Sequence, residues 1–290
     1  MAGNQLPEDL RTLIDIYNRR AANYDDSWHP DLAKDIISWF PPRPGDRILD
    51  LACGTGLVTY LASERAGTRG LVVGVDASPG MLEIAKAKAT NVSGSPRNII
   101  WLLSNIDSEE TFQREELRKV DAFDIIYCCS AMPLIPDPPR TLALWSRLLR
   151  PGGKIVFDYP TERTTTLGLL VHDVPRALGI HVPFSWRDWM KGQKSLVDAV
   201  EHAGLELITV TKTKSYVPEM ELRPEQSGEV FREAIETSQK NSELAKPDVR
   251  EQARETFRRE FEREAQKNGG LFTDGHWLYV VVAQKRKDEI

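Results

Sequence analysis

A turn of small residues follows the first apolar run of the chain and is suited to hold a ligand. Residues 48–51 are apolar apart from one acid, residues 52–56 read Ala-Cys-Gly-Thr-Gly, and a helical pattern begins at Leu57. Because glycine has no side chain, the backbone at Gly54 and Gly56 is free to take unusual dihedral angles and to approach a ligand closely. A strand, a tight glycine turn and a helix in this order are typical of a cofactor site at the carboxyl edge of an open sheet.

The charge at this turn indicates the kind of cofactor. Thr59 stands where the dinucleotide fingerprint has its third glycine, and Asp50 lies at the mouth of the turn. A carboxylate there would repel a pyrophosphate, whereas it would stabilise a cofactor that carries an ammonium and a sulfonium and no phosphate. Asp76 ends the next apolar run, close to the spacing at which an acid reaches ribose hydroxyls. Either acid alone is equally well explained as a helix N-cap or a loop residue, but together with the glycines they favour an adenosyl amino acid.

Strand-like and helical patterns alternate over residues 47–158. Short apolar runs separated by helical patterns predict an α/β fold with a parallel sheet and helices on both faces. The five runs lie at 48–51, 71–75, 99–103, 123–128 and 154–158, and two later strands are predicted at 205–211 and 277–283.

The segments outside this alternation define the expected domain organisation. Residues 1–44 are predicted to form an N-terminal helical cap of two amphipathic helices, and residues 45–290 form the main domain. Two inserts interrupt that domain, an aromatic one at about 159–192 and a strongly charged one at about 218–270. Inserts of this length are expected to be helical lids or binding surfaces, the alternative being a solvated helical flank.

Four segments in this order resemble the motif set of class I S-adenosylmethionine-dependent methyltransferases, in the style of the small-molecule group that includes the ubiquinone/menaquinone methyltransferases. They are residues 49–56, 75–78 followed by Met81, 123–126 and 148–153. The resemblance implies a Rossmann-like, seven-stranded, mostly parallel sheet whose last strand is antiparallel. It also implies S-adenosyl-L-methionine as cofactor, with S-adenosyl-L-homocysteine as its product, and no metal.

The resemblance further implies a set of cofactor-binding residues. Asp50 and the backbone of the glycine turn would hold the methionine part, Asp76 the ribose, and residues 105–107 the adenine amino group. The Cys128 backbone would face the transferring methyl, and Tyr24 belongs to a segment that closes over the cofactor. The full set is Tyr24, Asp50, Ala52, Gly54, Gly56, Asp76, Ala77, Met81, Asn105, Ile106, Asp107 and Cys128.

Fewer sequence signals identify the residues that contact the methyl acceptor than identify those that bind the cofactor. Methyl transfer from a sulfonium is an in-line displacement that relies mainly on proximity and desolvation, so a dedicated base is optional. Many relatives carry a histidine pair shortly after the fourth strand, where this chain has Met132-Pro133-Leu134. The candidate bases are His29, Asp158, Tyr159, Glu162, His172 and His181, of which Tyr159, His29 and His172 are preferred as catalytic residues. Each of them is also explained as a structural residue.

Aromatic side chains are concentrated in the segments expected to cover the ligand edge. They are predicted to line a pocket for a flat or apolar small molecule, the alternative being that they pack the insert onto the domain. The predicted pocket residues are Trp28, Tyr159, Phe184, Trp186 and Trp189.

Composition excludes several other classes. The 290 residues include 38 Lys and Arg against 43 Asp and Glu, so no basic field favours nucleic acid. No run approaches the roughly 18 apolar residues that span a bilayer. The three cysteines lack metal-ligand spacing and suit a reducing cytoplasm. The oligomeric state is left open.

The motifs leave two alternative functions. In one, the protein binds the cofactor but catalyses a cyclisation or rearrangement, or serves as a non-catalytic partner; the missing histidine pair motivates it. The other is a nicotinamide-dependent oxidoreductase, which Asp50 and the missing third glycine disfavour.

Overall fold

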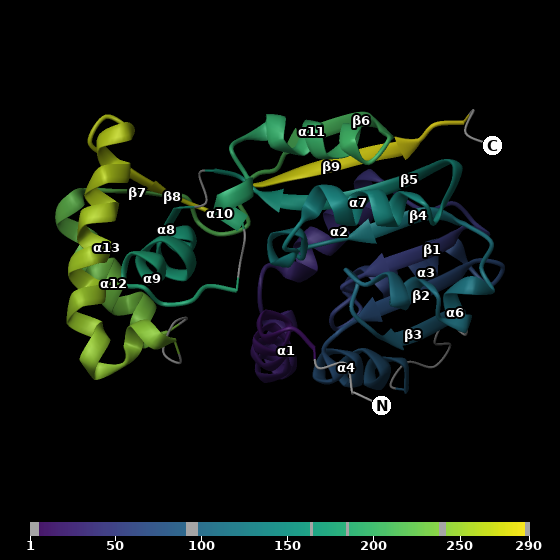
Figure 1. Ribbon diagram of the computed structural model, residues 1–290, viewed down its shortest axis with the longest axis horizontal. Coiled ribbons are helices and arrows are strands. Elements are labelled where there is room, and N and C mark those ends of the chain that lie inside the picture. Colours follow the sequence, from purple (N-terminus) through teal and green to yellow (C-terminus); the bar gives the residue numbers. More distant parts are fainter. Residues whose placement is uncertain (1–5, 91–97, 163–164, 184–185, 238–241, 288–290) are drawn as a thin grey trace. The chain divides into compact units, whose positions relative to one another are not determined.

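A seven-stranded sheet with the order β3-β2-β1-β4-β5-β9-β6 organises the chain (Figure 1). The computed structural model describes residues 6–90, 98–162, 165–183, 186–237 and 242–287. The strands are β1 (Arg47–Leu51), β2 (Leu71–Asp76), β3 (Ile99–Leu103), β4 (Phe123–Cys128), β5 (Leu149–Pro160), β6 (Leu205–Lys212) and β9 (Leu278–Lys285). The predicted mostly parallel sheet with an antiparallel last strand is confirmed.

The central strands are apolar on both faces because helices cover the sheet. Leu49 of β1 lies in parallel register with Val73 of β2 and with Ile126 of β4, and all three are fully buried. The helices of this region are α3 (Leu57–Ala66), α4 (Pro79–Thr90), α5 (Glu109–Phe112), α6 (Glu115–Arg118), α7 (Pro138–Ser146) and α11 (Gln193–His202), with the 3-10 turn η2 (Met132–Leu134). Parallel strands joined by such crossovers end at one common edge, which places the tips of β1, β2, β4 and β5 together.

The N-terminal segment consists of α1 (Glu8–Arg20), the 3-10 turn η1 (Ala21–Asp26) and α2 (His29–Trp39). Asn18 fixes α1 to the start of α4, since its Oδ1 accepts hydrogen bonds from the Ser78 hydroxyl at 2.7 Å and from the Gly80 N–H at 2.9 Å. The 3-10 turn that follows therefore starts from a defined position beside the sheet edge.

The chain divides into two compact units. The first comprises Met1–Tyr159, Gln193–Thr211 and Tyr279–Ile290, and the second comprises Pro160–Gly192 and Lys212–Leu278. The second unit is mostly helical and contains one antiparallel strand pair, β7 with β8. Its elements are α8 (Thr165–Gly168), the π-helical turn η3 (Leu169–Asp173), α9 (Val174–Ala177), α10 (Trp186–Trp189), β7 (Met220–Leu222), η4 (Pro224–Gln226), α12 (Ser227–Glu236), η5 (Glu243–Ala245), α13 (Pro247–Lys267) and β8 (Phe272–Asp274).

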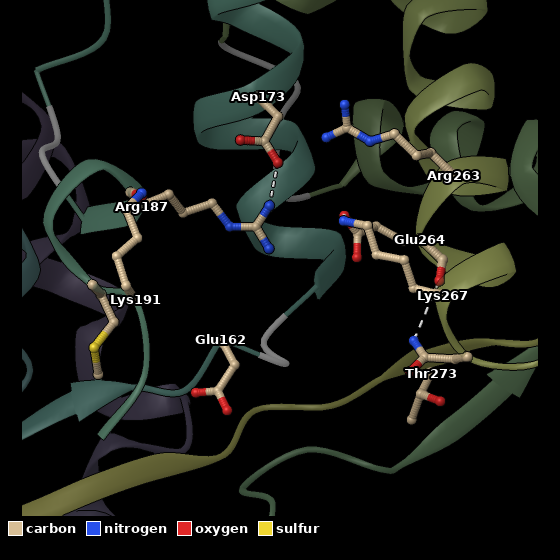
Figure 2. Close-up of a pocket in the computed structure, with 10 residues that line it drawn as sticks. Glu162, Asp173, Arg187, Lys191, Arg263, Glu264, Lys267 and Thr273 are labelled. Carbon is tan, nitrogen blue, oxygen red and sulfur yellow. Dashed lines mark hydrogen bonds and ion pairs between the residues drawn. The ribbon is translucent and has the colours of Figure 1, made fainter. Parts of the chain in front are cut away.

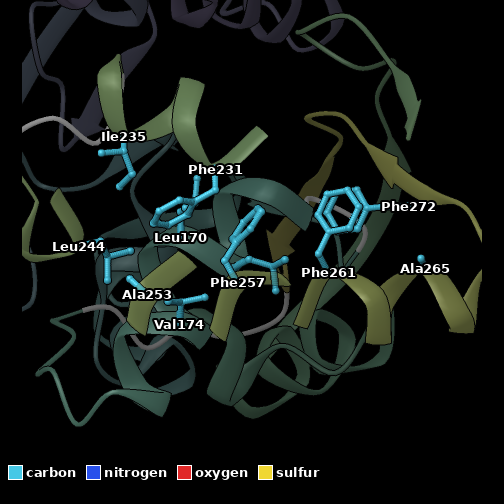
Figure 3. Packing of buried hydrophobic residues seen from close by; sticks show 11 residues of the cluster. Leu170, Val174, Phe231, Ile235, Leu244, Ala253, Phe257, Phe261, Ala265 and Phe272 are labelled. Atoms are coloured by element: carbon cyan, nitrogen blue, oxygen red, sulfur yellow. The ribbon is translucent and has the colours of Figure 1, made fainter. Parts of the chain in front are cut away.

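The second unit has its own apolar core, to which both of its chain segments contribute (Figure 3). Leu169 and Leu170 from the first segment lie in one cluster with Phe231 and Phe257 from the second. Phe261 of α13 stacks on Phe272 of β8 with ring centroids 3.7 Å apart. The long helix α13 carries its charges on the opposite side, where arginines pair with glutamates three or four residues away. The two inserts seen in the sequence thus fall largely in a single packed unit.

Candidate cofactor site

The turn between β1 and α3 has the unusual backbone that its glycines allow. Gly54 and Gly56 have φ angles of 56° and 84°, in the left-handed region. The turn is tied to the neighbouring strand, because the Cys53 N–H donates to the Val75 carbonyl at 3.0 Å. A Cβ added to Gly56 would lie 2.8 Å from the Trp101 ring, whereas one added to Gly54 would meet no described atom within 4 Å. Gly56 is thus required by packing, and Gly54 borders open space.

Two non-glycine residues in the described part of the chain also have a left-handed backbone, and both lie at this edge. Ala52 follows β1 with φ 54°, and Ser130 follows β4 with φ 58°. Each such conformation costs about 1–2 kcal/mol for a residue with a Cβ. Strain of this kind persists where the surrounding structure enforces it, and it is concentrated at functional sites.

Asp50 is buried near the tip of β1, and no lysine, arginine or histidine among the described residues forms an ion pair with it. Its side chain is 1% exposed, and its Oδ2 accepts a hydrogen bond from the Thr59 hydroxyl at 2.5 Å. Burial raises the pKa of Asp50 to about 7, the Thr59 hydrogen bond opposes this rise, and the charge of Asp76 adds to it. Burial therefore disfavours the ionised form of this carboxylate, and a bound cation would stabilise that form.

Asp76 at the tip of β2 is engaged by backbone groups on both oxygens. Its Oδ2 accepts from the Gly54 N–H and its Oδ1 from the Ser78 N–H, each at 2.8 Å. Burial raises the pKa of Asp76, and these N–H groups oppose the rise. The acid thus links the glycine turn of β1 to the loop after β2, and both loops belong to the predicted cofactor edge.

One pocket in the first unit brings the N-terminal segment, the glycine turn and the end of β4 together. Tyr24 and His29 form one wall, and the His29 ring lies against Tyr24 at 4.3 Å and stacks on Trp28 at 4.0 Å between ring centroids. The pocket is lined by Tyr24, His29, Leu32, Ala33, Asp50, Ala52, Cys53, Gly54, Thr55, Leu57, Val58, Cys129 and Ser130. One cavity is thus lined by four predicted cofactor residues, Tyr24, Asp50, Ala52 and Gly54, and by the predicted catalytic residue His29.

The N-terminal wall is held to the glycine turn by Asp25. One carboxylate oxygen of Asp25 accepts from the Thr55 hydroxyl at 2.6 Å, and the other lies 2.5 Å from the Lys88 ammonium. Lys88 also donates to the Thr55 carbonyl at 2.8 Å. This three-residue contact was not visible in the sequence, where Asp25 reads as part of a polar turn.

Loss of the Lys88 contact is expected to loosen the pocket wall. Because Lys88 and Asp25 are each about one third exposed, the pair contributes modestly, and we expect Lys88→Ala to weaken S-adenosylmethionine binding about 3- to 10-fold. Calorimetric titration measures the affinity, and limited proteolysis at residues 21–28 reports release of the segment. Lys86→Ala removes an exposed charge from the same helix and serves as the matched control. An equal loss of affinity in both variants would contradict the role of this contact.

Other predicted cofactor residues occupy the neighbouring loops. Met81 in α4 is buried, and Ala77 is half-buried. Asp107 accepts hydrogen bonds from Arg140 at 3.1 Å and from Thr141, both in α7. The described contacts of the Asp107 side chain are thus with α7, and its role toward adenine, like that of Asn105 and Ile106, stays a prediction.

The ends of β4 and β5 form the remaining side of the edge. Cys128 is fully buried, and burial, followed by the charge of Asp158, raises the pKa of its thiol. Asp158 of β5 is 1% exposed, and its Oδ1 accepts from the Ser130 N–H at 2.7 Å. Tyr159, predicted as a catalytic residue, follows Asp158 and is fully buried.

The remaining acceptor-side candidates belong to the second unit. His172 is 5% exposed and lies beside two carboxylates: its Nδ1 is 2.8 Å from Asp173 and its Nε2 is 3.6 Å from Asp188. Trp189 ends α10, and Trp186 begins it. Phe184 and the side chain of Trp186 lie outside the described residues. Catalytic and pocket roles for these residues stay predictions.

The second unit contains a pocket of its own, with mixed charge (Figure 2). Arg187 donates to Asp173, and Lys267 lies 2.7 Å from Glu264. The lining residues are Glu162, Asp173, Arg187, Met190, Lys191, Arg263, Glu264, Lys267, Asn268 and Thr273. The pocket is thus lined by both basic and acidic side chains, and two of its basic residues, Arg187 and Lys267, pair with carboxylates of the same lining.

The fold and the acidic, glycine-lined pocket define a class I S-adenosylmethionine-dependent methyltransferase. Residues 42–268 match the family model described as a methyltransferase domain, and the chain belongs to this family. The resemblance seen in the sequence is thereby confirmed. No described helix combines the length and the apolar character needed to cross a membrane.

Two curated relatives and one solved structure illustrate this membership. The chain is 27% identical over 210 residues to aklanonic acid methyltransferase DauC of Streptomyces sp. strain C5, covering 67% of this chain and 91% of that protein. It is 31% identical over 182 residues to demethylmenaquinone methyltransferase of Symbiobacterium thermophilum, covering 57% and 67%. The fold is similar to magnesium protoporphyrin IX methyltransferase of Synechocystis PCC 6803, with a TM-score of 0.58, 12% identity and coverage of 96% and 100%.

Proposed function

We propose that this methyltransferase transfers the methyl group of S-adenosylmethionine to a flat or apolar small molecule by in-line displacement. The observation that carries the proposal is the set of three buried carboxylates, Asp50, Asp76 and Asp158, at one sheet edge. In the described part of the chain none of them forms an ion pair with a lysine, arginine or histidine. Buried anions without counter-ions favour a cationic ligand.

The residues at the edge fit this cofactor. Asp50 would pair with its ammonium, Asp76 would accept hydrogen bonds from the ribose, and the backbone of Gly54 would approach the methionine part. When bound, the cofactor supplies an activated methyl group on a good leaving group. The contribution of the chain is then to hold the reactants in line and to exclude water, which the wall formed by Tyr24 and His29 supports.

The acceptor class is inferred from the relatives and from the aromatic residues. The two curated relatives are named for aklanonic acid and demethylmenaquinone. Trp28, which stacks on His29 of the pocket wall, is predicted to contact such an acceptor. Metal independence, a cytoplasmic location and a role in secondary metabolism belong to the same proposal, and the three free cysteines support a reducing compartment.

The proposal is tested by calorimetry and by turnover. We expect the protein to bind both S-adenosylmethionine and S-adenosylhomocysteine. With aklanonic acid and 1,4-naphthohydroquinone as probe acceptors, mass spectrometry is expected to find a product heavier by one methylene, in proportion to the S-adenosylhomocysteine formed and unchanged by a chelator. Failure to bind either cofactor form would overturn the proposal. A rearranged product of unchanged mass without S-adenosylhomocysteine would favour the cyclisation alternative.

A further inference from the structure

Asp158 is the carboxylate at the cofactor edge whose hydrogen bonding is least complete. Its side chain is 1% exposed, and its Oδ1 accepts the Ser130 N–H at 2.7 Å. Its Oδ2 is buried and has no hydrogen-bond partner among the described residues. An unpaired buried carboxylate oxygen is costly, so its presence calls for a ligand that it stabilises.

The contacts of Asp158 connect it to the cofactor pocket. Ser130, which donates to Asp158, lines that pocket and has the left-handed backbone described above. Cys129 also lines the pocket, and burial, followed by the charge of Asp158, raises the pKa of its thiol. Tyr24 on the opposite wall has its pKa raised mainly by burial, with the charge of Asp158 among the smaller causes. The negative charge of Asp158 therefore acts both on Cys129, which follows β4, and on Tyr24 in the N-terminal segment.

Asp50 and Asp158 stand at different strand ends and are held by different groups. Asp50 is the penultimate residue of β1, beside the glycine turn, and accepts a hydrogen bond from the Thr59 hydroxyl. Asp158 lies near the end of β5 and accepts from the Ser130 N–H. A cofactor with two cationic centres, an ammonium and a sulfonium, has one charge for each position. Since Asp50 suits the ammonium, the sulfonium is the cationic centre that remains for Asp158 at the ends of β4 and β5.

We infer that Asp158 is a specificity-determining residue that recognises the sulfonium charge and so distinguishes S-adenosylmethionine from S-adenosylhomocysteine. The inference rests on the proposed function. The two molecules share the ammonium, the carboxylate and the adenosyl group, and they differ in the sulfur, which is cationic in one and neutral in the other. A carboxylate near the sulfur therefore favours the substrate over the product, and its attraction ends once the methyl has left.

The test compares dissociation constants for the two molecules by calorimetry at pH 8. For the wild type we expect S-adenosylmethionine, and sinefungin with its amine in place of the methyl sulfonium, to bind more tightly than S-adenosylhomocysteine. Asp158→Asn keeps an oxygen to accept the Ser130 N–H but removes the charge. We expect it to weaken S-adenosylmethionine binding about tenfold or more while changing the S-adenosylhomocysteine constant less than about twofold.

Asp50→Asn is the matched control, because it removes a buried carboxylate that faces the shared ammonium. It is expected to weaken both ligands equally and to leave their ratio unchanged. Equal weakening of both ligands by Asp158→Asn, or a ratio altered only by Asp50→Asn, would overturn the inference. If Asp158→Asn does not fold, the three dissociation constants of the wild type test the inference. Binding of S-adenosylhomocysteine as tight as that of sinefungin and S-adenosylmethionine would refute the inference. Absence of binding of all three ligands to the wild type would instead refute the proposed function.

Discussion

The Asp50→Asn variant is expected to be more stable than the wild type at pH 8 when no cofactor is bound, and to bind S-adenosylmethionine about 10- to 100-fold more weakly. Burial raises the pKa of Asp50 from 3.8 to about 7, so the folded protein binds this proton more tightly than the unfolded chain does. Above pH 7 that difference lowers the free energy of unfolding by about 4 kcal/mol. Asparagine removes this cost but leaves an amide N–H unpaired, at about 2 kcal/mol. The net gain is about 2 kcal/mol.

The sign of this effect is expected to reverse with pH. As the pH falls from 7 to 4, Asp50 in the folded protein becomes neutral and its destabilising contribution disappears. The asparagine variant then keeps only its unpaired amide and is expected to be less stable than the wild type at pH 4. Urea unfolding at pH 8 and pH 4 measures both differences, and calorimetry measures the affinity. A variant that is less stable at both pH values would show that the carboxylate stabilises the fold.

Gly56→Ala is expected to lower the free energy of unfolding by about 3 kcal/mol. A left-handed backbone costs about 1 kcal/mol for alanine, and forcing a methyl into a packed site costs about 2 kcal/mol more. The added Cβ would lie 2.8 Å from Trp101 and 3.0 Å from Tyr60. The Tyr60 ring is anchored because its hydroxyl donates to the Ala85 carbonyl, and the Trp101 ring packs against it at 5.7 Å between centroids. Urea unfolding of the cofactor-free protein measures this change in the free energy of unfolding.

Gly54→Ala is the matched control for this steric argument. Its backbone is also left-handed, but its added Cβ would meet no described atom within 4 Å, so only about 1 kcal/mol is expected. Because Gly54 lines the pocket, the same methyl is expected to weaken S-adenosylmethionine binding. A smaller side chain at position 101, as in Gly56→Ala/Trp101→Leu, should restore part of the lost stability. Equal destabilisation by the two alanines would contradict the clash with Trp101.

The cofactor edge is predictable from sequence because its signals are local. Asp50 and the glycine turn lie within a few residues of the strand that places them, and Asp76 ends the next strand. The pairing of Asp158 with the Ser130 N–H joins residues 28 positions apart. From sequence alone, Asp158 is one of six candidate bases and is not among the three that are preferred. Only the structure, in which the ends of β4 and β5 lie side by side, shows the hydrogen bonding of Asp158. Among the described residues, one of its carboxylate oxygens accepts a hydrogen bond and the other accepts none.

The second unit shows the opposite case. The sequence predicts two separate inserts, an aromatic one at about 159–192 and a strongly charged one at about 218–270, each expected to be a helical lid or a binding surface. That Phe231 and Phe257 would share a core with Leu169 depends on chain segments about 60 residues apart, and periodicity contains no information on such contacts. The unit, and with it the placement of His172 beside two carboxylates, became visible only in the structure.

The shared core of the second unit limits how the two inserts can vary among relatives. Leu169 and Leu170 come from residues 160–192, while the phenylalanines that they pack against come from residues 212–278. A chimera that combined one segment from this chain with the other from a relative would bring mismatched shapes together in that interior. Transplanting both segments as a pair preserves their fit, so exchanges with a relative are best made jointly while the β1 and β2 loops are left untouched.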